Sequence, residues 1–188
     1  MKGKRIKCLI FDLDGTLFDT KKANTVAYQK AFSCLGVKMT KDDYEKVFGL
    51  RFREMAKKIA PNLSESELKK VKKIKSRYYR EFVYLIKANY ALFELIRHFR
   101  NTCKIFLVTT ASRRNVLFLL SYFKIKKYFD YVLCGESVER AKPYPDCYKV
   151  CFKKAGVSPK EALIFEDSKI GIEAARKSGA NYCVVKMK

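Results

Sequence analysis

Five short apolar segments alternate with helical patterns along most of this chain, and this alternation is the feature that most limits its fold. The segments expected to form strands are Arg5–Phe11, Lys104–Thr109, Tyr131–Cys134, Ala162–Phe165 and Tyr182–Val185. The helical patterns between them are Leu92–Arg100, Arg113–Phe123, Pro145–Ala155 and Lys169–Lys177. Such an alternation predicts an α/β fold, in which helices cover both faces of a parallel sheet.

The segment at residues 21–88 interrupts this alternation, because it shows helical patterns and no strand pattern. Two pairs of residues within it have the spacing of capping boxes, which begin helices. These pairs are Thr40 with Asp43 and Ser64 with Glu67. The sequence therefore predicts a core domain formed by residues 1–20 and 89–188, with an all-helical domain inserted at residues 21–88.

The first apolar segment leads directly into the string Phe11-Asp12-Leu13-Asp14-Gly15-Thr16-Leu17-Phe18-Asp19-Thr20. Alternation places Asp12 and Asp14 on one side of a strand, and Gly15 permits a turn that aims both carboxylates into one small space. Two buried like charges stay ionised only when a cation or a proton lies between them. Oxygen-only ligands at a phosphate site favour magnesium. For a D-x-D pair alone, a solvated turn at an ordinary strand end is the alternative.

Two further motifs place polar groups at the ends of elements. The segment Lys104–Thr109 continues into Thr110, and hydroxyl and N–H groups at such a strand end suit phosphate oxygens. Lys142 stands in a K-P-Y-P-D string before a helix, where a compact cation can neutralise a carboxylate and a phosphoryl group. Taken alone, this residue would be interpreted as a surface lysine.

The fourth motif is the acidic pair Glu166 and Asp167, which follows another apolar strand. The alternative for Asp167 or Ser168 is a helix N-cap, since a helical pattern begins directly afterwards. Ligands of parallel α/β sheets bind beyond the carboxyl ends of the strands, and each of the four motifs falls at such an end. The sequence therefore predicts one site that contains all four.

The four motifs, in this order, resemble those of the haloacid dehalogenase-like phosphohydrolases, and the resemblance covers nearly the whole chain. It implies a Rossmann-like core with an inserted helical cap, as in the branch of phosphoglycolate phosphatase and β-phosphoglucomutase. In that scheme Asp12 is the nucleophile and Asp14 is the general acid and base, while Thr109 and Lys142 stabilise the transferring oxygens.

The resemblance also implies a cofactor, Mg²⁺, and a set of residues around it. The ion would be held by Asp12, the backbone carbonyl of Asp14 and Asp167, with Glu166 in the surrounding shell. The candidate substrate-binding residues are Thr110 and, in the insertion, Arg51 and Arg53. A solvated helix start is the alternative for the two arginines.

The implied activity is magnesium-dependent hydrolysis of a small phosphomonoester through an aspartyl-phosphate intermediate. A phosphosugar mutase of the same fold would use the same residues and return the phosphoryl group to its substrate. The alternative from another class is a non-catalytic protein that binds nucleic acid through its basic surface. The intact set of carboxylates and lysine speaks against that alternative.

The net charge of +22 is spread along the chain, with 18 basic and 8 acidic residues in segment 17–87. Spread charge attracts anionic substrates and gives weak, salt-sensitive nucleic-acid binding, so we expect no specific nucleic-acid partner. The stretch Lys69–Arg80 holds seven basic residues and no acid. We interpret it as the solvated side of an amphipathic helix, with a face for nucleic acid or an acidic partner as the alternative.

The seven cysteines contain no C-x-x-C pair, which favours reduced thiols. No apolar run reaches the length needed to span a membrane. We therefore expect a cytoplasmic enzyme that acts on a small phosphorylated metabolite and does not bind a membrane.

Overall fold

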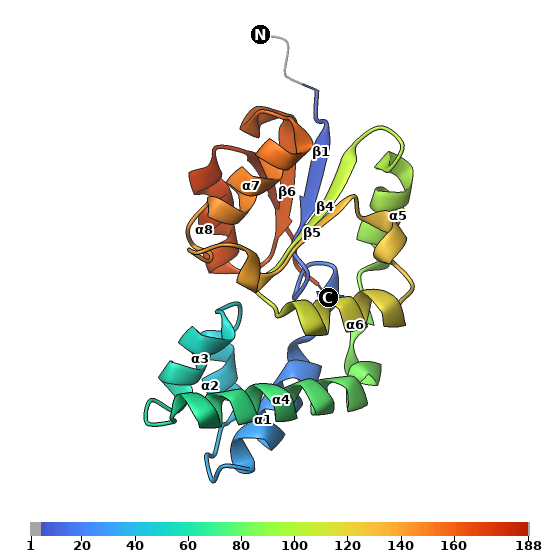
Figure 1. The fold of residues 1–188 in the computed structure, drawn as a ribbon. Helices are drawn as coiled ribbons and strands as arrows, with labels where there is room; N and C mark the ends of the chain where they lie inside the picture. The colour runs from blue at the N-terminus through green and yellow to red at the C-terminus, as the bar shows by residue number, and fades with distance from the viewer. Residues whose placement is uncertain (1–4, 188) are drawn as a thin grey trace. The chain divides into compact units, whose positions relative to one another are not determined.

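A computed structural model describes residues 5–187, and its central feature is a five-stranded parallel sheet (Figure 1). The order of the strands is β5-β4-β1-β6-β7. Their bounds are Cys8–Phe11 for β1, Lys104–Val108 for β4, Tyr131–Leu133 for β5, Ala162–Glu166 for β6 and Asn181–Val184 for β7. The first strand therefore lies in the middle, and every apolar segment predicted to form a strand contributes one to this sheet.

The middle strand is fully apolar because both of its faces are covered. All four residues of β1 are buried, and Cys8 pairs with Lys104 on one side and with Ala162 on the other. Ile10 faces one side of the sheet, in a cluster with side chains of α7 (Asp146–Ala155) and α8 (Lys169–Ser178). On the other side the rings of Phe11 and Phe165 stack, with centroids 4.6 Å apart.

The helices of the core lie on both faces of the sheet, as the alternation predicts. The helices α7 and α8 cover one face, whereas α5 (Tyr90–Phe99) and α6 (Arg113–Tyr122) lie on the other (Figure 1). This arrangement follows from right-handed crossovers, since the chain moves outward from β1 to β5 and then returns across the sheet to β6 and β7. Short 3₁₀ turns complete the core at η2 (Lys126–Tyr128), η3 (Gly135–Ser137) and η4 (Pro159–Glu161).

The chain divides into two compact units. One comprises the described residues up to Phe18 and from Ala88 onwards, and the other comprises Asp19–Lys87. The sequence places these limits at 21 and 88, and residues 1–4 and 188 of the expected core lie outside the described part. Two short strands, β2 (Phe18–Asp19) and β3 (Lys87–Ala88), pair where the chain passes between the units.

The second unit, called the cap here, has its own apolar centre and is built from helices. These are α1 (Lys21–Ser33), α2 (Lys41–Val47), α3 (Phe52–Ile59), α4 (Glu65–Glu81) and the 3₁₀ turn η1 (Val83–Leu85). Both expected capping boxes are present, with Thr40 at the start of α2 and Ser64 at the start of α4. The cluster at its centre includes Phe32, Met55 and Val71.

The structure differs from the sequence-based expectations mainly at the ends of elements. The apolar repeat that begins at Leu68 continues to Leu85, but α4 ends at Glu81 and the chain tightens into η1. The first strand begins at Cys8, three residues after the expected start. Among the described residues, no helix combines the length and the apolar character that crossing a membrane would require.

Candidate active site

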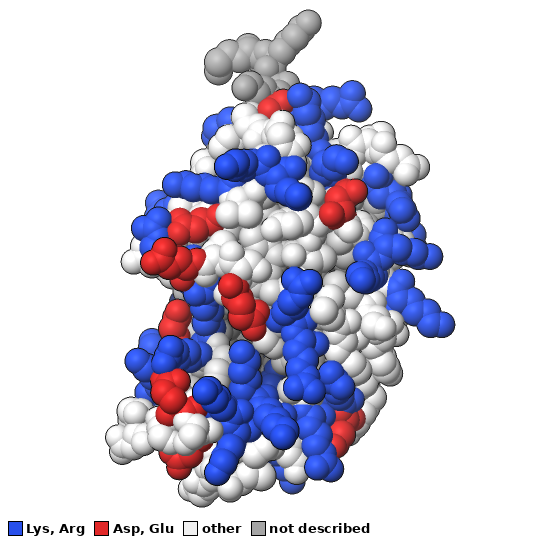
Figure 2. Space-filling view, in the orientation of Figure 1, with Lys and Arg blue, Asp and Glu red and all other residues white. Residues whose placement is uncertain are grey.

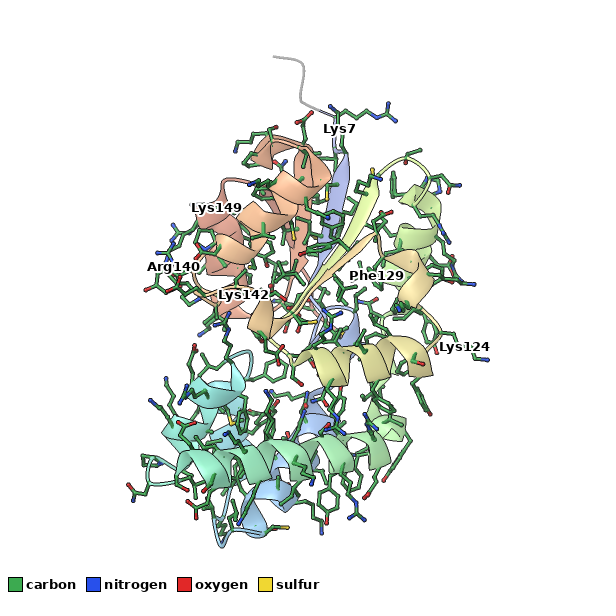
Figure 3. All side chains as sticks on the ribbon, in the orientation of Figure 1. Lys7, Lys124, Phe129, Arg140, Lys142 and Lys149 are labelled. Carbon is green, nitrogen blue, oxygen red and sulfur yellow. The ribbon has the colours of Figure 1, made fainter. Side chains whose placement is uncertain are left out.

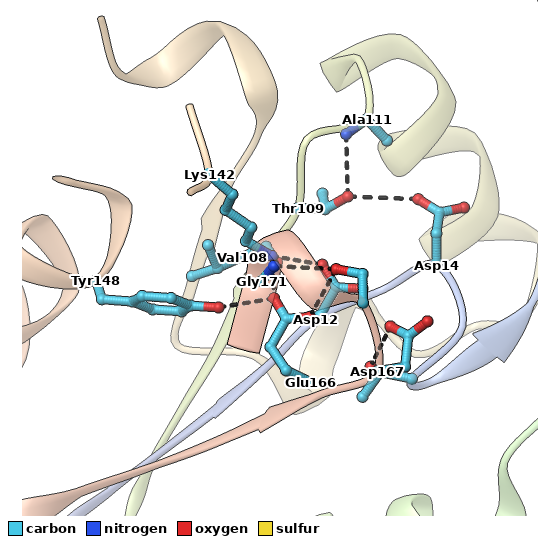
Figure 4. Close-up of polar contacts among 12 residues, drawn as sticks. Asp12, Asp14, Val108, Thr109, Ala111, Lys142, Tyr148, Glu166, Asp167 and Gly171 are labelled. Carbon is cyan, nitrogen blue, oxygen red and sulfur yellow. Dashed lines mark hydrogen bonds and ion pairs between the residues drawn. The ribbon is translucent and has the colours of Figure 1, made fainter. Parts of the chain in front are cut away.

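The carboxyl ends of β1, β4 and β6 bring the four motifs together in the core (Figure 4). Asp12 follows β1 directly, and its Oδ1 accepts a hydrogen bond from Nζ of Lys142 at 2.6 Å. The same ammonium donates to the backbone carbonyl of Val108 at 3.3 Å and to Oε1 of Glu166. Figure 3 shows Lys142 at this end of the sheet and Lys7 at the opposite end of β1. The lysine therefore joins three neighbouring strands at one point.

Glu166 is completely buried and its carboxylate has three side-chain partners. Besides Lys142, Tyr148 donates its hydroxyl to Oε1 at 2.7 Å and Ser168 donates to Oε2 at 3.3 Å. A Cβ added at Gly171 would lie 2.1 Å from Oε2, so the close approach of α8 depends on this glycine. These contacts fix the side chain of Glu166, which in turn positions Lys142 beside Asp12.

Asp14 and Thr109 form the second part of the site. The Thr109 hydroxyl accepts a hydrogen bond from the backbone N–H of Ala111 at 3.0 Å, which directs its own proton toward Oδ2 of Asp14 at 3.4 Å. Asp14 is half-buried, whereas Asp12 and Thr109 are buried. The two carboxylates of the first motif thus differ in environment, since one has an ammonium as its partner and the other a hydroxyl.

Asp167 occupies a third corner, beside the turn that follows Asp14. Its Oδ1 accepts a hydrogen bond from the Thr16 hydroxyl at 3.0 Å. Gly15 has a φ of +95°, and a Cβ there would lie 2.1 Å from Oδ2 of Asp167. The glycine is therefore needed for its backbone conformation and for the approach of the carboxylate. Ser168, not Asp167, caps α8 by accepting from the N–H of Gly171 at 3.1 Å.

Asp12, Glu166 and Asp167 each offer an oxygen, and these oxygens all lie within 4.8 Å of one another. Burial raises the pKa of the Asp12 carboxyl, opposed by Lys142 and reinforced by the neighbouring acids. Burial also raises the pKa of Asp167 to about 6, with a further contribution from Glu166. Burial acts to lower the pKa of Lys142, but Asp12 and Glu166 outweigh it and hold the value well above its usual range. Three acids therefore face one cation.

The remaining predicted residues lie near the sheet or in the cap. Thr110 follows Thr109 directly, and its backbone carbonyl packs so closely on Gly135 that a Cβ there would lie 2.2 Å away. In the cap, Arg51 is half-buried and precedes α3, while Arg53 is exposed and forms an ion pair with Glu65. The assignment of these three residues to substrate binding stays a prediction.

Several contacts in the site were not expected from the sequence. Tyr148 lies on α7 and Thr16 on the turn after Asp14, where they donate hydrogen bonds to Glu166 and Asp167. A tyrosine or a threonine at these positions gives no sign of such a contact in the sequence. In the cap, Lys75 belongs to the basic run interpreted as solvated, but it is buried with Nζ 4.1 Å from the ring centre of Tyr79 and 4.8 Å from that of Tyr28. The spacing offers a signal here, since position 75 shares the helix face of Leu68 and Val71.

Comparison with known families decides the assignment. A model described as haloacid dehalogenase-like hydrolase matches residues 9–185, which is nearly the whole chain. The chain belongs to the haloacid dehalogenase-like hydrolase family. All four motifs of the site fall within the matched range, so the family model and the geometry concern the same residues.

Among curated proteins of the family, the chain is similar to two phosphatases. It is 32% identical over 181 residues to the phosphorylated carbohydrates phosphatase of Thermotoga maritima, covering 93% of this chain and 82% of that protein. It is 24% identical over 188 residues to the fructose-1-phosphate phosphatase YqaB of Escherichia coli, covering 98% of each chain.

Solved structures show the same fold. CbbY from Rhodobacter sphaeroides in complex with phosphate superimposes with a TM-score of 0.87 at 24% identity, covering 97% of this chain and 87% of that one. The β-phosphoglucomutase of Clostridium difficile gives a TM-score of 0.83 at 23% identity, covering 94% and 83%. At these identities the likeness concerns the fold alone.

Proposed function

We propose that this chain is a phosphomonoester phosphatase that works through an aspartyl-phosphate on Asp12. The observation that carries the proposal is the buried Asp12–Lys142 pair at 2.6 Å. Beside this pair, Asp14 accepts a hydrogen bond from the Thr109 hydroxyl. The Lys142 ammonium opposes the rise in pKa that burial causes at Asp12, and it therefore favours the ionised form that can attack a phosphoryl group bound at the ends of the strands. The named phosphatase relatives support the same activity.

In the first step, an oxygen of Asp12 attacks phosphorus in line, and the bond from phosphorus to the leaving oxygen breaks. Asp14 gives its proton to that leaving oxygen, so the alcohol departs neutral. In the second step Asp14 takes a proton from water, which attacks phosphorus and releases inorganic phosphate and Asp12. Lys142 and the Thr109 hydroxyl offer hydrogen bonds to the phosphoryl oxygens, where negative charge develops.

The acidic residues fit a divalent cation of the Mg²⁺ type. The donors are oxygen only, and the excess of buried acids over Lys142 leaves negative charge that a cation would relieve. Asp12, Asp167 and the backbone carbonyl of Asp14 are the proposed ligands, since Glu166 already accepts from three side chains. When bound, Mg²⁺ offsets the repulsion between carboxylate and phosphate.

The proposed substrate is a small phosphorylated metabolite. Sugar phosphates are the first candidates, because the two phosphatase relatives are named for phosphorylated carbohydrates and for fructose-1-phosphate. Thr110 of the core and Arg51 and Arg53 of the cap are the proposed groups that bind it. The cysteines are all free thiols, which supports a reducing compartment such as the cytoplasm.

The replacement Asp12→Asn tests the nucleophile, and exposed Asp42→Asn on α2 is the matched control. We expect Asp12→Asn to lower turnover by at least about 10³-fold and to keep the circular dichroism spectrum of the wild type, because only the nucleophilic charge is lost. The wild type and the control should form an acid-stable, hydroxylamine-sensitive phosphoryl adduct. Normal turnover without Asp12 would overturn the mechanism.

Product analysis distinguishes hydrolysis from the mutase alternative, since a β-phosphoglucomutase has the same fold. A panel of sugar phosphates, phosphoglycolate and nucleoside monophosphates is incubated with the enzyme and Mg²⁺, and the products are separated. Free phosphate supports the phosphatase, whereas an isomerised sugar phosphate would support the mutase.

Removal of the metal tests the cofactor. We expect excess chelator to abolish turnover and Mg²⁺ to restore it, while Ca²⁺ restores it poorly because its coordination is larger and looser. Asp167→Ala should raise the Mg²⁺ concentration needed for half-maximal turnover, and Asp42→Asn should leave it unchanged. Full turnover in excess chelator would contradict the metal assignment. An unchanged Mg²⁺ requirement in Asp167→Ala would remove Asp167 from the metal site.

A further inference from the structure

The loop that carries Lys142 contains a polar contact that the proposed chemistry does not use. Arg140 lies two residues before Lys142, and Asp146 is the first residue of α7. The Arg140 guanidinium donates from Nε to Oδ2 of Asp146 at 2.8 Å and from Nη2 to Oδ1 at 2.9 Å. Such a bidentate pair constrains the angle between the two groups as well as their distance. It therefore joins the two ends of the loop formed by residues 140–146.

The backbone of this loop can form few hydrogen bonds of its own, because two of its residues are prolines, which have no N–H. The N–H of Tyr144 donates to the carbonyl of Ala141 at 2.9 Å, and this bond closes a turn around Lys142. Arg140 and Asp146 flank this turn on its two sides. Their side chains therefore add a second, wider link around the lysine.

The ring of Tyr144 adds a contact to the Arg140–Asp146 pair at the surface. Cζ of Arg140 lies 4.9 Å from the centre of this ring, and Nζ of Lys177 on α8 lies 5.9 Å from it. Cations are attracted to the face of such a ring. Figure 2 shows acidic and basic side chains close together at the surface near the position of Arg140 in Figure 3. Exposed ion pairs usually contribute little, but bidentate geometry is the exception, and this pair has that geometry.

Lys142 depends on the position of this loop because its ammonium ends a flexible four-carbon stem. Its Nζ lies 2.6 Å from Oδ1 of Asp12 and 3.3 Å from the carbonyl oxygen of Val108, and it also donates to Glu166. These contacts hold the charged end of the side chain, whereas the loop holds its backbone. A shift of the loop would therefore strain or break the contact between Lys142 and Asp12.

We propose that the Arg140–Asp146 pair, called the loop clamp here, positions Lys142 for phosphoryl transfer. Both members are positioning residues, since they act on the reaction through Lys142. The inference rests on the proposed function, in which Lys142 donates to the phosphoryl oxygens as negative charge develops on them. Loss of the clamp should lower kcat and leave KM nearly unchanged, because it weakens an interaction that is made mainly in the transition state.

The replacement Arg140→Ala tests the effect of the clamp on turnover, and Arg97→Ala is the matched control. Arg97 is exposed on α5 and pairs with Glu94, so each variant removes one exposed ion pair and one positive charge from the core. We expect Arg140→Ala to lower kcat by about tenfold with a change in KM below about twofold. Arg97→Ala should change neither parameter by more than about twofold. Equal effects of the two variants on kcat would overturn the proposal.

A double-mutant cycle tests whether the two members act together. Asp146→Ala should lower kcat by about the same factor as Arg140→Ala, and the double variant should lower it by no more than either single replacement, because the two side chains form one unit. Losses that multiply in the double variant would show two independent effects and would overturn the clamp.

Acetylation of lysines by acetic anhydride, followed by mass spectrometry, reports on Lys142 without any turnover. The Lys142 side chain is 3% exposed and its ammonium donates to three acceptors, so it should react slowly in the wild type. Arg140→Ala should raise its rate of acetylation by about fivefold or more, because the loop opens more readily. Exposed Lys149 on α7 should react at one rate in every variant, and Arg97→Ala should leave both rates unchanged.

An unchanged rate of Lys142 acetylation in Arg140→Ala would overturn the proposal, even if kcat falls. The proposed function fails by a different result, which is full turnover by Lys142→Ala. Because acetylation needs no substrate, a raised Lys142 rate together with that result would refute the catalytic role of Lys142 and leave its positioning by the clamp in place.

Discussion

At the scale of single residues, Gly15 is constrained twice, by its backbone conformation and by a neighbouring carboxylate. Its φ of +95° disfavours any side chain, and an added Cβ would lie 2.1 Å from Asp167. Gly36 has a φ of +72° but no atom within 4 Å of such a Cβ. Both glycines therefore have a backbone conformation that would strain any replacement, and they differ in what an added methyl group would meet.

Replacement of each glycine by alanine separates these two effects. We expect both variants to lose about 1–2 kcal/mol of unfolding free energy, which thermal or urea unfolding measures. Gly15→Ala alone should raise the Mg²⁺ concentration for half-maximal turnover, because Asp167 must move away from the new methyl group. An equal Mg²⁺ requirement in the two variants would show that Asp167 moves without consequence for the metal.

At this scale the sequence indicates the proposed catalytic residues and says less about the residues that hold their side chains in place. Asp12, Asp14, Lys142 and Asp167 lie in motifs long enough to be recognised, and the structure brings them to one end of the sheet. Tyr148 and Thr16 hold two of the acids through single hydrogen bonds across the fold. Such contacts depend on which elements become neighbours in space, so spacing along the chain gave no sign of them.

At the scale of elements, Glu161 connects the starts of two neighbouring strands. Its carboxylate accepts from the N–H and hydroxyl of Ser158, at 2.9 and 2.8 Å, and lies 2.6 Å from Nζ of Lys7. The Lys7 ammonium, together with the two groups of Ser158, lowers the pKa of Glu161 from an ordinary 4.5 to about 2. The folded state therefore binds this proton less readily than the unfolded chain, and ionised Glu161 stabilises the fold.

The sign of this shift predicts how Glu161→Gln depends on pH. The stabilisation is complete above about pH 4.5 and is lost as the pH falls toward about 2. We expect the variant to melt below the wild type at pH 7, with a difference that shrinks as the pH falls below about 4.5. Glu173→Gln, which removes an exposed pair with Lys177, should have a smaller effect at pH 7. A difference in melting temperature that stays constant with pH would contradict the assignment.

The elements themselves were largely predictable, because strand and helix patterns alternate and each cap helix has an apolar face. The boundaries were less so, as α4 shows: its apolar spacing continues beyond Glu81, but the backbone tightens into η1. Hydrophobic periodicity identifies the buried face of a helix and contains little information about the residue at which the helix ends. The short strands β2 and β3 were missed because two residues cannot display an alternating pattern.

At the scale of the whole molecule, the proposed catalytic groups lie in one unit and the proposed selectivity groups lie in the other. The core contains Asp12, Asp14, Lys142 and Asp167, whereas Arg51 and Arg53 belong to the cap. The proposal assigns recognition of the remote part of the substrate to the cap arginines, and binding energy from that part raises turnover only when it is realised in the transition state.

The cap arginines test this division of roles, and the structure distinguishes between them. Arg53 is exposed and already forms an ion pair with Glu65, whereas Arg51 is half-buried at the start of α3. We expect Arg51→Ala to lower kcat/KM for the preferred metabolite by roughly 10- to 150-fold, the equivalent of a charge-assisted contact of about 1.5–3 kcal/mol. Arg53→Ala should lower it by a smaller factor, because the ion pair with Glu65 competes with the substrate for the Arg53 guanidinium.

A small ester provides the control, because p-nitrophenyl phosphate has little remote part for the cap to bind. On this ester Arg51→Ala should lose less than about threefold in kcat/KM when salt is matched, since a basic protein attracts every anion and salt weakens that attraction. Equal losses on both esters would mean that Arg51 contributes general electrostatic attraction only. A loss on the metabolite alone would assign substrate choice to the cap and leave the chemistry to Asp12, Asp14 and Lys142.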